Sequence, residues 1–337
     1  MFSMAMTSSS EFVDDLLRRE NSVSPGLRQT NPLGGYTVNR EHINALRHFE
    51  LFTAHTIGAP ISRHIIRSQV LPLALSSPHL MHSLIAISET HLHHLVPTYD
   101  CGQFKASYHW ELAMASFQRE LVLPPAQHNM DAMVSTCMML AVLAFTGSNS
   151  QDSDSWIFSP VRSGTNWLYV QGGLSTILSQ YKERAARNIW IPVIHDADDH
   201  EGTFSDESPG PEGIPATFVD LCDIDENSDS DSNPYHRPLR VISNLQKIEA
   251  SSFTFTKLIS FVGDIDNGYR DLLQNKDPRA LLILAYWFGM MCAVDQWWVQ
   301  KRVRSECSAI CMFLANNPDQ RIQQLLEGPA RACGYRR

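Results

Sequence analysis

Two apolar stretches decide the fold: SPHLMHSLIAISETHLHHL at residues 77–95 and DPRALLILAYWFGMMCAVDQWW at residues 277–298. In the first stretch, Leu80, Leu84 and Ile87 recur at helical spacing. Ser77 followed by Pro78 is typical of a helix start, because serine caps free backbone N–H groups and proline suits the first helical position. The second stretch predicts the most apolar helix of the chain. Both stretches therefore indicate buried helices.

The rest of the chain also has helical periodicity, and no strand pattern persists beyond a few residues. We therefore predict an all-α protein, a multi-helix bundle around one core. Beyond the two stretches above, helices are expected near residues 103–121, 130–145, 165–179, 301–315 and 319–326. Helical character is also expected from residue 41 to before Gly58, and again from Pro238 onward.

Composition divides the chain into three parts. Residues 1–38 are rich in Ser, Asn, Pro and Gly and are expected to form a disordered lead. Residues 196–236 are expected to form an acidic flexible loop, in which only residues 218–222 have the apolar character to dock. Residues 39–195 and 237–330 together are expected to form one helical regulatory-type domain.

Charge and cysteine content exclude several classes of protein. The net charge is −9, but residues 196–231 hold 13 acidic residues and no Lys or Arg, which leaves 27 basic against 23 acidic residues elsewhere. Without clustered basic residues, direct nucleic-acid binding is not expected. The longest strongly apolar run, residues 280–294, is too short for a membrane span. Seven widely spaced cysteines without a secretory signal indicate free thiols.

The sequence predicts no metal site and no cofactor. His91 and His94 share a helix face, but Glu89 lies on another face, so the ligands do not converge. We expect the histidines of this helix, including His79 and His82, to occupy caps and rim positions. Cys307 and Cys311 are four residues apart and could touch, yet no CxxC pair exists. Nucleotide-binding and nucleophile motifs are also absent from the sequence.

The candidate site is a cluster of aromatic and methionine side chains near the C-terminal end. We predict a pocket for a hydrophobic ligand there, since Met and aromatic side chains suit apolar pockets between helices. The same spacing would arise if these side chains simply packed against neighbouring helices in the core, and we favour that interpretation over the wall of a cavity. A buried carboxylate within the cluster would need water or a partner. The candidate residues are Tyr286, Trp287, Met290, Met291, Asp295 and Trp298.

Several phrases of the chain resemble a known family. They are HFELFTAHT (48–56), VLPLALSSPHLMHSLIAISETHL (70–92), WLYVQGG (167–173) and PRALLILAYWFGMM (278–291). Together they resemble the C-terminal regulatory domain of fungal zinc-cluster transcription factors of the sterol-uptake-control type. The resemblance implies an α-helical bundle with a C-terminal pocket for a sterol-like ligand, walled by Trp287, Met290, Met291 and Trp298.

The zinc cluster of that family requires six cysteines within about thirty residues, a spacing that this sequence lacks. We therefore expect a regulatory, ligand-sensing protein of fungal metabolism without its own DNA-binding domain. It would act through a DNA-binding partner, in the nucleus or cytoplasm, and its large apolar helices are compatible with a homodimer.

Two alternatives remain open. The first is a motif-less enzyme on the same scaffold, an intramolecular cyclase such as a [4+2] pericyclase, or an isomerase, in terpenoid or polyketide biosynthesis. Such chemistry depends on shape and orientation more than on a catalytic motif. The second is a decayed paralogue with no ligand.

Overall fold

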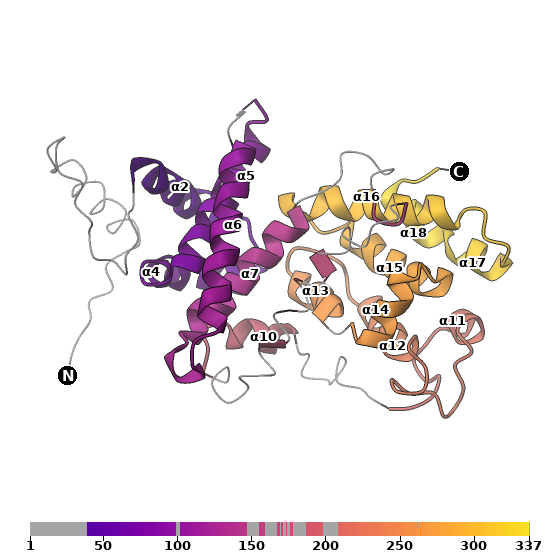
Figure 1. Cartoon of the computed structure of the whole chain (residues 1–337). Helices are drawn as coiled ribbons and strands as arrows, with labels where there is room; N and C mark the ends of the chain where they lie inside the picture. The colour runs from indigo at the N-terminus through magenta and orange to yellow at the C-terminus, as the bar shows by residue number, and fades with distance from the viewer. Residues whose placement is uncertain are drawn as a thin grey trace, which may run out of the picture. The chain divides into compact units, whose positions relative to one another are not determined.

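The computed structural model describes residues 39–98, 102–146, 155–158, 167, 168, 170, 173, 176, 177, 187–197, 208–263 and 265–336. These residues form helices and turns with no strand among them, so the all-α prediction is confirmed (Figure 1). The predicted disordered lead and most of the helix expected at residues 165–179 lie outside the described residues.

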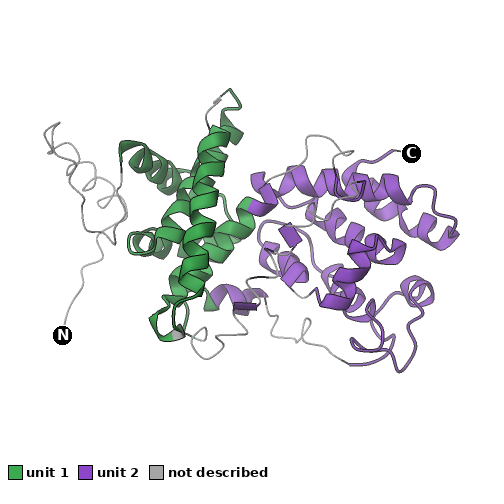
Figure 2. Cartoon of the chain, in the orientation of Figure 1, with its two compact units in different colours: residues 1–143, 181–191 green, residues 144–180, 192–337 purple. Residues whose placement is uncertain are grey.

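The chain divides into two compact units (Figure 2). Unit 1 comprises Met1–Leu143 and Tyr181–Ile191, and unit 2 comprises Ala144–Gln180 and Pro192–Arg337. The prediction that the helical parts of both act as one domain stays a prediction.

Unit 1 is built around α5 (Pro78–Leu95), which packs along α6 (Gly102–Leu121) and against α2 (Arg40–Leu51). Leu80, Leu84 and Ile87 of α5 are fully buried, as the periodicity of the sequence predicted. The remaining helices that begin in this unit are the 3₁₀ turns η1 (Thr53–His55) and η3 (Pro125–Gln127), α3 (Pro60–Ile65), η2 (Ile66–Val70), α4 (Leu71–Ala74) and α7 (Met130–Thr146).

Pro72 does not end the helical path. It follows a short, partly apolar stretch of sequence, and α3, η2 and α4 run through it one after another. The middle segment, η2, is a π-helical turn. Proline lacks an N–H and its ring clashes with the carbonyl four residues earlier. A wider turn just before Pro72 relieves that clash, so the path continues through the proline.

Unit 2 is organised around α15 (Pro278–Met291), which packs against α16 (Trp297–Leu314) and α18 (Glu327–Cys333). Asp277 caps the start of α15 by accepting from the backbone N–H groups of Arg279 and Ala280. Within the described part of the chain, no helix combines the length and apolar character that a bilayer crossing requires. The other helices are α10 (Ile191–Ala197), α11 (Ala216–Leu221), α12 (His236–Leu245), α13 (Phe255–Gly263), α14 (Asn267–Gln274) and α17 (Gln320–Leu325).

The structure describes residues 208–236 of the acidic segment, and these residues form a short helix and hydrogen-bonded turns. Phe218 of α11 is buried, and its ring meets that of Tyr286 at 5.1 Å edge to face, so residues 218–222 dock. Asp225 and Asp229 fold the chain into turns by accepting from backbone N–H groups two or three residues later. Short acidic side chains therefore supply local hydrogen bonds here, which composition alone does not reveal.

Candidate functional site

The centre of unit 2 is an aromatic cluster around Trp287 of α15. The Trp287 ring stacks with Phe261 at 5.7 Å and lies parallel to Trp167 at 6.3 Å, and Phe145 meets it edge to face. Offset and edge-to-face pairs of this kind contribute about 0.5–1.5 kcal/mol each beyond burial. We define the aromatic cluster as Phe145, Trp167, Phe255, Phe261, Trp287, Phe288 and Trp298.

Trp287 is held in one orientation. Its side chain is fully buried, and its indole N–H donates to the backbone oxygen of Leu258 over 2.7 Å. Trp298 is similarly fixed, because its indole N–H donates to Oε1 of Gln296 over 2.8 Å. Both side chains therefore act as rigid parts of the cluster with their polar groups satisfied.

Trp167 differs from these two tryptophans. It is 2% exposed, yet its Nε1 has no hydrogen-bond partner among the described residues. A buried donor left without a partner costs about 1–3 kcal/mol. Trp156, 5% exposed, has the same unpaired indole N–H but is not a member of the aromatic cluster. The indole of Trp167 is thus a donor within an apolar, ring-lined environment.

A buried ion pair lies against the same rings. The guanidinium of Arg302 sits 5.5 Å from the centre of the Phe145 ring and 5.9 Å from that of Trp167. It is 3.6 Å from Glu306 one helical turn later, and Ser155 donates its hydroxyl to the other oxygen of this carboxylate. Burial lowers the pKa of Arg302, and the neighbouring carboxylate of Glu306 opposes that effect.

Arg302 also closes the end of α7. Its Nε donates to the backbone oxygen of Phe145 over 2.7 Å, and Nη2 donates to that of Ala144 over 3.2 Å. The last carbonyls of a helix have no partner inside the helix, and they carry partial negative charge. The Arg302 side chain therefore satisfies these carbonyls and places a cation beside the aromatic cluster.

The six predicted pocket residues are not all brought together. Trp287, Met291 and Trp298 are buried, and both tryptophans contact Phe145. Tyr286 is half-buried and donates its hydroxyl to the backbone oxygen of Leu325, which joins α15 to the end of α17. Met290 is half-buried, and Asp295 is exposed to solvent. Ligand binding by the six residues stays a prediction.

Sequence reasoning missed Arg302 and Glu306. A basic run such as KRVR at residues 301–304 is typical of a solvated helix face, but only Lys301 and Arg304 are exposed, and Arg302 is buried. The signal was present in the sequence: an Arg and a Glu four residues apart share a helix face with the apolar side chains of Val299 and Ile310. Phe145 and Trp167 come from distant parts of the chain, so local periodicity could not connect them to Trp287.

The histidines of α5 are also placed differently from the prediction. His79, His82 and His91 are buried instead of lying at the rim. Nδ1 of His79 lies 2.7 Å from the Thr136 hydroxyl, Nδ1 of His82 lies 2.9 Å from Nδ1 of His109, and Nδ1 of His91 lies 3.0 Å from the Thr53 hydroxyl. Burial lowers the pKa of each of these four histidines to about 4. They are neutral hydrogen-bonding members of the core.

Comparison with known proteins places the fold in a family context. Residues 44–187 match the model of the fungal specific transcription factor domain. The sterol uptake control protein 2 of Candida albicans is 23% identical over 272 residues, which is 75% of this chain and 37% of that protein. Its namesake from Saccharomyces cerevisiae is 24% identical over 247 residues, 71% of this chain and 25% of that protein.

A Zn(2)-C6 fungal-type transcription factor of Gibberella zeae is 22% identical over 310 residues, which is 86% of this chain and 61% of that protein. The chain thus spans between 25% and 61% of the length of these relatives. The resemblance drawn from the sequence phrases is confirmed in that residues 44–187 match the fungal specific transcription factor domain and these relatives bear the names of fungal regulators.

Proposed function

We propose that this chain regulates the transcription of fungal metabolic genes in response to a sterol, which it binds at the aromatic cluster of unit 2. The similarity to two sterol uptake control proteins carries this proposal. It extends over 272 residues in the first of them, so it reaches beyond the matched domain at residues 44–187. The comparisons favour this regulatory role over the alternative of a cyclase or isomerase.

The chemistry of the cluster supports a sterol as the ligand. A sterol is a rigid apolar ring system with one hydroxyl group, so it needs an apolar surface and a hydrogen-bond partner. The rings of the aromatic cluster, buried against one another in this structure, would supply that surface, and the unpaired indole N–H of Trp167 would supply a donor for the hydroxyl oxygen. A ligand oxygen there would recover the free energy that the buried donor otherwise loses.

Regulation also needs a route to DNA and to the nucleus. The chain spans only part of its relatives, so a zinc cluster elsewhere in the same protein or a DNA-bound partner would provide that route. The family of the matched domain favours the nucleus over the cytoplasm. The role of the chain itself is then to sense the ligand and change the activity of the assembly.

A reporter assay tests this function without knowledge of the natural DNA element. The chain is fused to a heterologous DNA-binding domain in yeast, and reporter output is measured with sterol synthesis intact or blocked and then with ergosterol added back. We expect output to change when sterol is depleted and to return with ergosterol. In Trp167→Phe, the ergosterol concentration needed should rise about five- to tenfold, since one hydrogen bond contributes roughly 1 kcal/mol.

Trp156→Phe is the matched control, because it removes a second buried, unpaired indole N–H from the same unit but outside the aromatic cluster. It should respond as the unchanged chain does. A wild-type reporter that ignores sterol, or two variants that shift equally, would contradict the proposal. Conversion of a linear polyene by the purified chain alone, with no reporter response, would instead establish the enzymatic alternative.

A further inference from the structure

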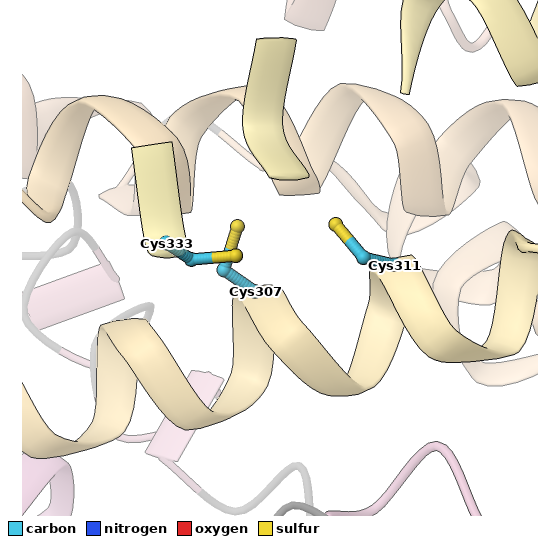
Figure 3. A group of neighbouring side chains, drawn as sticks. All are labelled: Cys307, Cys311 and Cys333. Atoms are coloured by element: carbon cyan, nitrogen blue, oxygen red, sulfur yellow. The ribbon is translucent and has the colours of Figure 1, made fainter. Parts of the chain in front are cut away.

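Three cysteine side chains converge in unit 2, away from the residues discussed so far. The Sγ atoms of Cys307, Cys311 and Cys333 all lie within 4.8 Å of one another (Figure 3). Cys307 and Cys311 are one turn apart on α16, and Cys333 is the last residue of α18. Among the described residues, this thiol cluster is the one group of three or more metal-ligating side chains whose ligand atoms meet.

Helix packing fixes the thiols in place. The Sγ of Cys307 lies 3.6 Å from the backbone oxygen of Ala285 in α15 and 3.6 Å from that of Pro329 in α18. α18 passes close to Gly289 of α15, where a Cβ would lie in van der Waals contact with Cα of Pro329 at 3.5 Å. Three helices therefore hold the sulfur atoms together before any ligand binds, which lowers the entropic cost of binding.

The thiol cluster is electrostatically unlike the other buried cysteines. Hydrogen bonds from the Cys307 and Cys311 thiols, with help from the backbone N–H of Tyr335, lower the pKa of Cys333 to about 3. Hydrogen bonds with Cys311 and Cys333, together with burial, raise the pKa of Cys307. By contrast, burial raises the pKa of Cys137, Cys222 and Cys292 to about 12. Metals bind cysteine in the thiolate form.

The cluster has a path to solvent at Cys333. Cys307 and Cys311 are fully buried, whereas Cys333 is half-buried. Its neighbours Ala330 and Gly334 line an open surface pocket. An ion can therefore reach the sulfur of Cys333 first and the two buried thiols second.

We propose that Cys307, Cys311 and Cys333 form a three-thiolate site for monovalent copper. A structural zinc site needs four ligands, and no His, Asp or Glu of the described residues joins these three. Soft thiolates select Cu(I), and three of them at about 2.3 Å from one ion would lie about 4 Å apart. Each thiol gives up its proton to solvent as its sulfur binds, so Cu(I) is held by three thiolates with no change in its oxidation state.

The sequence predicted no metal centre because it showed only the Cys307 and Cys311 pair. The third thiol comes from another helix, and only tertiary packing brings it close. The site would connect copper supply to the regulatory chain, since the ion would tie α16 to α18 at the C-terminal end of unit 2.

The test is a copper titration of the full chain, reduced and kept without oxygen. Cu(I) is competed between the protein and the chelator bathocuproine disulfonate, and X-ray absorption counts the sulfur ligands. We expect one Cu(I) per chain with three sulfur neighbours. Cys333→Ala should weaken binding by at least about 100-fold, since loss of a ligand exceeds the 10–100-fold effect of losing an outer partner.

Cys292→Ala is the matched control, a buried cysteine of the same unit outside the thiol cluster, and it should bind copper as the unchanged chain does. Because Cys333 is half-buried, its variant should keep the helical circular dichroism; Cys311→Ser provides a second variant if it does not. Equal copper affinity in Cys333→Ala and wild type would overturn the proposal. So would tighter binding of Zn(II) than of Cu(I), or a disulfide that forms and leaves no copper site.

Discussion

Unit 1 and unit 2 bury polar groups in different ways. Unit 1 buries four neutral histidines, each hydrogen-bonded to a hydroxyl or to another histidine. Unit 2 buries the Arg302–Glu306 ion pair, a thiol cluster and the unpaired indole of Trp167. The histidines of α5 are paired with hydroxyl groups or with His109 of α6, whereas unit 2 buries a charged pair, a group of thiols and an unpaired indole N–H. For this reason we assign the proposed sensing role to unit 2 and a structural role to the buried histidines of unit 1.

The largest expected difference between the units is their response to acid. The pKa of His79, His82, His91 and His109 is about 4 in the folded chain, against about 6.5 when unfolded. The unfolded chain therefore takes up protons first, so the stability present above pH 6.5 is lost as pH falls toward 4. Between pH 7 and pH 5, each histidine should cost about 1–2 kcal/mol.

Hydrogen exchange resolved by peptide measures this response in each unit separately. Peptides from α5 and α6 should lose protection as the pH falls from 7 to 5, after correction for the intrinsic exchange rate, while peptides from α15 and α16 change less. Equal loss in both units, or no loss in α5, would show that the buried histidines do not control the stability of unit 1.

The next effect concerns unit 2 alone. Glu306→Leu leaves Arg302 buried without its carboxylate and removes the acceptor of Ser155, so it should destabilise unit 2 by about 3–5 kcal/mol. The measurement is urea unfolding followed by exchange of α15 and α16 peptides. The double variant Arg302→Met with Glu306→Leu removes both charges and should recover most of that loss. A double variant as unstable as the single one would mean that the ion pair itself, and not charge balance, stabilises the core.

Sequence patterns located the helices better than they located the site. The buried face of α5 and the apolar α15 followed from local periodicity, because helix formation and burial leave a repeating signal. The polar side chains buried in the two cores did not follow from local periodicity. His79 pairs with Thr136, Arg302 with the end of α7, and Cys333 with Cys307, and each pair joins residues far apart in the sequence.

The acidic segment and Asp295 show a second reason why the environments of polar side chains could not be predicted from the sequence. Acidic residues such as Asp225 and Asp229 are typical of disordered segments, but here their side chains accept hydrogen bonds that close turns. The charge of the segment therefore did not predict its local order. Asp295 follows an apolar helix directly, yet it lies beyond the end of α15 and faces water. Composition gives the average environment of a segment, whereas a single turn decides where one side chain points.

The most direct test of the sensor role is hydrogen exchange of the purified chain with and without ergosterol delivered from cyclodextrin. We predict that α15 and the residues around Phe261 gain protection, that α5 does not change, and that Trp167→Phe reduces the gain while Trp156→Phe keeps it. Protection of α5 instead of α15, or no protection in either unit at saturating ergosterol, would contradict the assignment of ligand sensing to the aromatic cluster of unit 2.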